Sequence, residues 1–127
     1  MKKNYLKILG GITSLGMIFF ALQSFIFTKN APTTVTGEIL DMKCYMASGA
    51  HGDGHKQCAL KCINQGEPMG ILAEDGQVYL LVADGHDAAP YNEAKKYAGE
   101  QVTLTGSLEK TNGVQALIVM EVKPKAS

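Results

Sequence analysis

The stretch QVTLTGSLEKTNGVQALIVMEV, from Gln101 to Val122, carries the clearest signal of the fold. Its first eight residues alternate between apolar and polar, which places Val102 and Leu104 on one face of a strand and the threonines on the other. Asn112-Gly113 follows, and Asn-Gly is the dipeptide most typical of a tight β-hairpin. Residues 114–122 then return as a second strand. The stretch predicts a hairpin at the end of a β domain.

Three further strands are predicted upstream. Residues 69–73 (MGILA) and 78–82 (VYLLV) flank an Asp-Gly turn and form another hairpin. The second run is almost entirely apolar, so we expect it to be buried on both faces. Residues 35–41 (VTGEILD) have the β-branched content of a first strand. Gly37 and Gly106 lie inside strands, at positions where barrels often bend or bulge.

One late helix separates the two hairpins. Residues 87–98 (DAAPYNEAKKYA) begin with Asp87 as a possible cap, carry Pro90 in the first turn and are followed by Gly99. The resulting order is three strands, a helix and two strands, which is that of a five-stranded OB-like Greek-key barrel. The sequence therefore predicts a mainly β domain, a β-barrel with one helix; a small open α+β sheet is the alternative.

The N-terminal segment has the pattern of a membrane helix. Residues 8–27 carry no charge over twenty residues and follow three lysines, Lys2, Lys3 and Lys7. Such a helix spans roughly 30 Å, the thickness of the bilayer interior. The lysines place the N-terminus in the cytoplasm. We expect residues 1–30 to be an uncleaved anchor, or else a cleaved signal peptide, although no small-x-small cleavage site is evident.

This segment also predicts where the domain works. Residues 31–127 form the exported domain, which faces the periplasm at the inner membrane, or is periplasmic if residues 1–30 are cleaved. Disulfides are permitted in that compartment. All twelve cationic residues are lysines and twelve residues are acidic. Three of the lysines precede the uncharged run, so the chain from Lys29 onward carries a net charge of −3. A domain without a basic face is not expected to bind nucleic acid.

The chemistry is concentrated in an insert at residues 42–69, between the first and second strands, which we call the Cys/His insert. Its cysteines and histidines follow the spacing C-x6-H-x3-H-x2-C-x3-C. A short helix over residues 55–64 would place two cysteines and one histidine on one face. The first cysteine, at the end of the first strand, would face them across a glycine-rich loop. The predicted metal ligands are Cys44, His55, Cys58 and Cys62, with His51 as an alternative or additional ligand.

Three interpretations of the insert remain open. Thiolates and imidazole suit zinc or copper(I), and the methionines nearby give copper equal weight. A disulfide from Cys44 to Cys58 or Cys62 would instead tie the insert to the barrel and leave one thiol over. Redox cycling of a Cys pair comes third, because C-x3-C is not the thioredoxin-like C-x-x-C. No catalytic motif is present, so a binding domain is expected before an enzyme.

Residues 35–122 resemble small exported bacterial OB-fold-like proteins of uncharacterised function that have a Cys/His-rich insert. The resemblance is carried by Gly37–Asp41 with Cys44, by His55 with Cys58-Ala59 and Cys62-Ile63, and by Gly66–Pro68. Residues 98–106 are similar to the fourth strand of periplasmic OB-like domains. The C-x3-C also looks like the copper pair of Sco-type assembly factors, which have a thioredoxin fold and a proline where Ile63 stands.

The resulting hypothesis is an extracytoplasmic, membrane-anchored accessory domain that binds zinc or copper. Its role would be structural or in metal handling, near a membrane redox or respiratory assembly. Its expected partners are the membrane, through residues 8–27, and a membrane protein complex. A disulfide-stapled binding module without metal is the alternative, and a thiol oxidoreductase is the third possibility.

Overall fold

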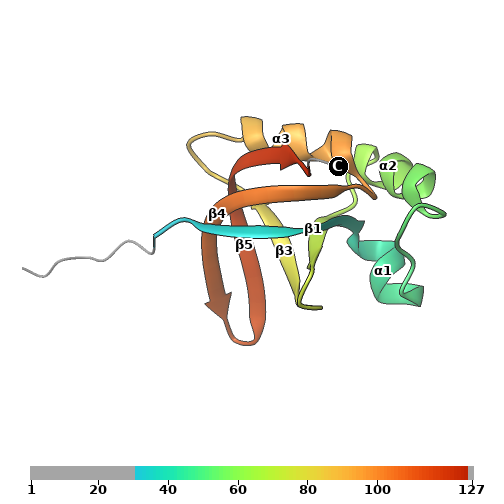
Figure 1. The fold of residues 1–127 in the computed structure, drawn as a ribbon, viewed down its shortest axis with the longest axis horizontal. Helices are drawn as coiled ribbons and strands as arrows, with labels where there is room; N and C mark the ends of the chain where they lie inside the picture. The colour runs from blue at the N-terminus through green and yellow to red at the C-terminus, as the bar shows by residue number, and fades with distance from the viewer. Residues whose placement is uncertain (1–30, 126–127) are drawn as a thin grey trace, which may run out of the picture.

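The computed structural model describes residues 31–125, in which five strands close into a barrel with the order β1-β2-β3-β5-β4 (Figure 1). Every pairing is antiparallel except that of β3 with β5, which is parallel. The elements are β1 (Thr33–Asp41), α1 (Met42–Ser48), α2 (Lys56–Asn64), β2 (Met69–Ala73), β3 (Val78–Ala83), α3 (Ala89–Ala94), η1 (Lys95–Tyr97), β4 (Gln101–Thr111) and β5 (Val114–Pro124).

The barrel confirms the predicted class, and the alternative of an open α+β sheet is wrong. The sheet closes because β1 pairs with β2 on one side and with β4 on the other. The predicted membrane segment, residues 8–27, lies outside the described residues. Within residues 31–125, no helix combines the length and the apolar character needed to cross a bilayer.

The C-terminal hairpin forms as its sequence predicts. Asn112 and Gly113 have φ values of 49° and 87°, the two positive values that a two-residue hairpin turn requires. Val102 and Leu104 are fully buried, whereas the threonines between and after them are only partly buried. The alternating pattern therefore identifies the face of β4 that lines the core.

Two glycines let neighbouring strands come close. A Cβ atom on Gly37 would lie 2.1 Å from the carbonyl oxygen of Leu72, and one on Gly106 would lie 2.1 Å from that of Ile118. The register of β4 against β5 also shifts between Thr105 and Gly106, which is a β-bulge. Both glycines therefore lie where the barrel has no room for a side chain, and the bulge at Gly106 confirms the prediction for that position.

Two details of the prediction are wrong. The strand β3 is not buried on both faces: Tyr79 and Leu81 point into the core, whereas Val82 is 38% exposed. A strand of a small barrel has one outer face, and part of that face meets solvent here. The domain also has more than one helix: α2 forms in the insert where residues 55–64 are predicted to be helical, whereas α1 is not predicted. Cys44 therefore lies in α1 rather than at the end of a strand.

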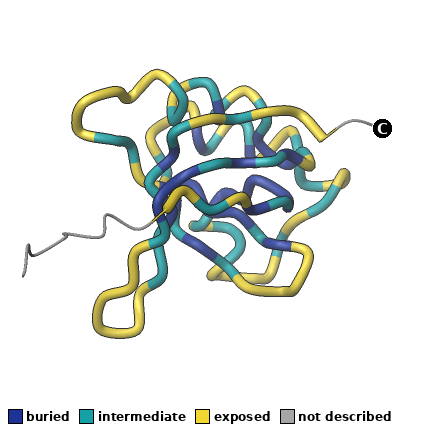
Figure 2. The backbone as a smooth tube through the Cα atoms, turned by 60° about the vertical axis from the view of Figure 1, so that its left-hand side comes forward, coloured by how far each residue is buried: buried dark blue, intermediate teal, exposed yellow. Residues whose placement is uncertain are grey.

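The insert folds against one end of the barrel, where β1 ends (Figure 1). Helix α2 buries Ala59 and Ile63, each 2% exposed, in the barrel core. Helix α1 buries none of its residues. Figure 2 shows that the buried backbone is concentrated in the strands, while the connecting turns are exposed. The insert is thus attached to the barrel core through α2, and α1 lies outside that core.

Candidate metal centre

Three thiols from two helices meet beside the end of β1. Cys44 comes from α1, and Cys58 and Cys62 lie one turn apart on α2. The three sulfur atoms lie within 4.8 Å of one another, and all three cysteines are free thiols. Tetrahedral zinc with Zn–S bonds of about 2.3 Å separates its sulfurs by roughly 3.8 Å. The thiols therefore need to close by at most about 1 Å to bind one ion.

Local contacts hold α1 in the position that brings Cys44 to α2. The side chain of Asp41 caps the helix by accepting a hydrogen bond from the Lys43 backbone N–H at 3.0 Å. Gly49 ends the helix with a φ of 71°. Across the insert, the Lys43 ammonium pairs with Glu67 at 2.7 Å, and the Met42 N–H donates to the Pro68 carbonyl at 3.0 Å. Polar contacts thus fix the N-terminal end of the helix, and none of its residues is buried.

A second group of potential ligands adjoins the thiols. Asp41, Cys44 and His55 bring one carboxylate oxygen, one sulfur and one imidazole nitrogen within 4.8 Å of one another. Asp41 is 1% exposed. Its Oδ2 atom and Nε2 of His55 are 3.9 Å apart, and both are buried without a hydrogen-bond partner. The structure therefore places His55 with Asp41 and Cys44, next to the three-thiol group.

The sequence interpretation did not include Asp41 among the site residues. An aspartate that ends a strand and precedes a helix is ordinarily a cap, and Asp41 does fill that role through Oδ1. The available signal was its position three residues before Cys44, which puts both side chains in the first turn of α1. What the sequence does not reveal is that the second carboxylate oxygen is buried.

The Asp41 carboxylate and its neighbouring thiols shift one another's pKa values. Burial raises the pKa of Asp41, but its interactions with Cys44, Cys62 and the Lys43 N–H together lower it below the ordinary 3.8. The interaction with Asp41, followed by burial, raises the pKa of Cys44 from 9.0 to about 12. Burial, followed by Asp41, also raises the pKa of Cys62. Without a bound cation the two thiols are therefore protonated at neutral pH, and metal binding has to release those protons.

His51 lies apart from both groups. Its Nδ1 atom is 3.5 Å from the carboxylate of Glu38, a residue of β1 that is only 7% exposed. The same carboxylate accepts a hydrogen bond from the Gly52 N–H at 2.6 Å. Glu38 thus holds the glycine-rich loop against the barrel, and His51 contributes to this attachment.

The methionines of the insert do not gather at the thiols. Met69 is fully buried and belongs to the barrel core. The Met42 sulfur packs against Gly70, where a Cβ atom would meet it at 2.3 Å. Met46 is 74% exposed on α1. The sequence argument for copper from methionine neighbours is therefore weaker than the argument from the thiols.

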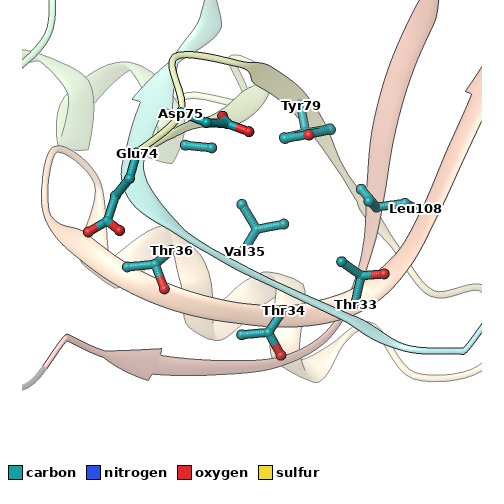
Figure 3. Close-up of a pocket in the computed structure, with 9 residues that line it drawn as sticks. Thr33, Thr34, Val35, Thr36, Glu74, Asp75, Tyr79 and Leu108 are labelled. Carbon is teal, nitrogen blue, oxygen red and sulfur yellow. The ribbon is translucent and has the colours of Figure 1, made fainter.

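A separate cavity of about 420 Å³ opens at the other end of β1 (Figure 3). Its two acids are already engaged: Glu74 pairs with Lys125 at 2.6 Å, and Asp75 accepts from the Gln77 N–H at 2.9 Å. None of the predicted ligands lines it. The lining residues are Thr33, Thr34, Val35, Thr36, Ala73, Glu74, Asp75, Tyr79 and Leu108.

No family model, curated protein or solved structure matches this chain. The function is therefore inferred from the chemistry of the chain's own residues. The strongest such chemistry is the pair of ligand groups that share Cys44, one made of three thiols and one of mixed oxygen, sulfur and nitrogen. Both groups suit transition-metal ions.

Proposed function

We propose that this domain binds a transition-metal ion, zinc or copper(I), through Cys44, Cys58 and Cys62. The observation that carries the proposal is the convergence of three free thiols, from two helices, within 4.8 Å of one another. Clusters of thiolates are preferred by zinc and by copper(I) among the metals of biology. Zinc takes four ligands, so one position is left for His55 or for a donor from outside the domain.

The position of the thiols favours a role in metal handling over a purely structural role. Cys58 is exposed, and Cys44 and Cys62 are only partly buried, so an ion there stays accessible to an exchange partner. The barrel core is made mostly of strand residues and includes none of the thiols. A bound metal would connect α1 to α2, whereas the barrel is stabilised by its hydrophobic core without the metal.

The proposal extends to where the domain acts. The order β1-β2-β3-β5-β4 is that expected of an OB-like barrel, which supports the predicted likeness to exported OB-like domains. The uncharged run at residues 8–27 supports a membrane anchor with the barrel on the extracytoplasmic side. We place the domain beside a membrane redox or respiratory assembly, to which it would supply or from which it would receive the ion.

Metal analysis combined with thiol titration tests the proposal. The full chain is purified without chelators, and its zinc and copper contents are measured together with its reactive thiols. We expect at least one metal equivalent per chain, and three thiols after the metal is removed. The variant Cys44→Ser should lose the metal, whereas His86→Ala, which changes an exposed histidine outside the insert, should retain it. No metal and one disulfide per chain would refute the proposal.

The same distances also permit a second candidate function. In an oxidising compartment Cys44 could instead pair with Cys58 or Cys62, whose sulfurs lie within 4.8 Å of its own, and one thiol would then be left over. In this case the insert is a disulfide-stapled surface for a partner protein. Thiol oxidoreductase activity fits less well, because the nucleophile in such enzymes is a thiolate, whereas here the pKa values of Cys44 and Cys62 are raised.

A further inference from the structure

We propose that Asp41, Cys44 and His55 form an inner ligand set for a divalent cation such as Zn²⁺, distinct from the outer three-thiol set and sharing Cys44 with it. The proposal deepens the proposed function, because it assigns different ions to two adjoining positions. Zn²⁺ would occupy the inner position and copper(I) the outer one. The sequence predicts one set of three cysteines and one histidine. The proposal divides it into an outer set of three thiols and an inner set that contains His55.

The first support is a pair of buried polar atoms that lack partners. Oδ2 of Asp41 and Nε2 of His55 are buried without a hydrogen bond to a nitrogen or oxygen atom, and the side chains that interact with the Asp41 carboxylate are the Cys44 and Cys62 thiols. Burying such atoms without a partner is costly, and native proteins rarely leave them so. A cation between the two atoms would satisfy both at once, because each supplies one lone pair.

The second support is the separation of these atoms. At 3.9 Å, Oδ2 and Nε2 are too far apart for a direct hydrogen bond. Two ligands of one tetrahedral zinc ion, with bonds of about 2.0 to 2.1 Å, lie roughly 3.3 Å apart. The observed gap is closer to this value than to a hydrogen bond of about 2.9 Å. The Cys44 sulfur completes the set within 4.8 Å.

The third support is charge. Asp41 is 1% exposed, and in residues 31–125 its only ion-pair partner is the imidazole of His55. The nearby ammonium of Lys43 is bound to Glu67 at 2.7 Å instead. A divalent cation would balance the Asp41 carboxylate and a Cys44 thiolate together. Because carboxylate is a hard ligand, this set favours Zn²⁺ over copper(I), whereas the set of three soft thiols suits copper(I).

Metal titration of three variants of the full chain separates the two positions. The probes are Co²⁺ and Zn²⁺ for the inner set and copper(I) for the outer set, all under reducing conditions in competition with chelators. The double variant Cys58→Ser/Cys62→Ser should bind no copper(I) tightly but should keep one equivalent of Co²⁺, with the absorption bands of a site containing a single thiolate. His51→Ala is the matched control and should bind all three ions as the wild type does.

The variant Asp41→Asn supplies the reciprocal result. Its amide oxygen can still accept from the Lys43 N–H, so the cap of α1 is kept. Zinc affinity should fall about tenfold or more, while copper(I) affinity stays at the wild-type value. Circular dichroism checks the fold, and if Asp41→Asn does not fold, His55→Gln replaces it with the same expected result.

Two results would overturn the inner set. One is a folded Cys58→Ser/Cys62→Ser variant that binds no Co²⁺. The other is a folded Asp41→Asn variant whose zinc affinity is unchanged or falls only in step with its copper(I) affinity. Failure of the proposed function looks different, because the wild-type chain would then bind no copper(I) tightly and its Co²⁺ spectrum would match that of the Cys58→Ser/Cys62→Ser variant.

Discussion

The barrel and its Cys/His insert are held together by different means. The barrel packs fully buried aliphatic side chains, such as Ile71, Leu104 and Leu117, inside strands whose hydrogen bonds close on themselves. The insert contributes Ala59, Ile63 and its last residue, Met69, to that core and otherwise depends on caps, ion pairs and single hydrogen bonds. The insert also contains the three free thiols, and the two buried polar atoms without partners lie where it joins β1, one on Asp41 and one on His55.

This difference indicates where a ligand would act. A core of packed aliphatic residues gains nothing from a metal ion, because its atoms are already in contact with one another. A segment with unpartnered ligand atoms gains order when an ion binds, since binding adds contacts that the chain alone does not supply. The comparison can be tested by damaging either region separately.

Truncating the barrel core should have the largest effect. Leu104→Ala removes a fully buried side chain of β4 and should lower the free energy of unfolding by about 3 kcal/mol. Urea denaturation of the metal-free chain measures this change. Val114→Ala, at a position that is 57% exposed, is the control and should change it little. A loss below about 1 kcal/mol for Leu104→Ala would mean that the core relaxes around the cavity.

Adding metal should stabilise the insert more than the barrel. Zinc at about a hundred times its dissociation constant should raise the free energy of unfolding by roughly 2.7 kcal/mol. Amide hydrogen exchange should slow most in α1 and in the loop that precedes α2. Cys44→Ser removes the ligand common to both sets and should abolish the change. Equal slowing in β4 and β5 would show that the two regions are not independent.

High pH should destabilise the metal-free chain through Cys44. The pKa of this thiol is about 12 in the folded chain and 9.0 without the fold, so the unfolded chain loses its proton first. The stabilising contribution is thus complete below pH 9.0 and is lost as the pH rises toward about 12. Melting temperatures across this range should fall more steeply for the wild type than for Cys44→Ser. Parallel curves would contradict the interaction with Asp41.

Removing the His51 side chain should have the smallest effect. His51 is half exposed and contacts Glu38, so His51→Ala should cost at most about 0.5 kcal/mol in the free energy of unfolding. Hydrogen exchange in the adjacent loop should rise slightly while metal binding is unchanged. A lower metal content would instead support the sequence-based expectation that His51 is a ligand.

The strands were predictable because their signals are local. Alternation along residues 101–108 and the Asn112-Gly113 turn specify a hairpin without reference to the rest of the chain. The exposure of Val82 was not predictable in this way, because it depends on which outer face of the barrel remains uncovered. The parallel contact between β3 and β5 likewise joins segments that are distant in sequence.

The site was predictable in its residue types but not in its arrangement. The cysteine spacing identified the thiols, and the i, i+4 relation of Cys58 and Cys62 placed them on one helix face. Helix α1 escaped prediction because it buries no residue and so has no apolar periodicity. The role of Asp41 escaped it because burial of a single carboxylate oxygen depends on the packing of α1, α2 and β1 together.

The site and the barrel also differ in the sequence separation of the residues that come into contact when each one forms. The thiols lie within the stretch from Cys44 to Cys62, whereas closing the barrel joins partners such as Thr36 and Thr103, which are 67 residues apart. The entropy of forming a loop grows with its length, and this difference makes the shorter closure cheaper by about 1 kcal/mol. As the chain emerges from its N-terminal end, the whole metal-binding stretch precedes β4 and β5. An ion can therefore be captured before the barrel is complete, so metal supply can influence the order in which the domain folds.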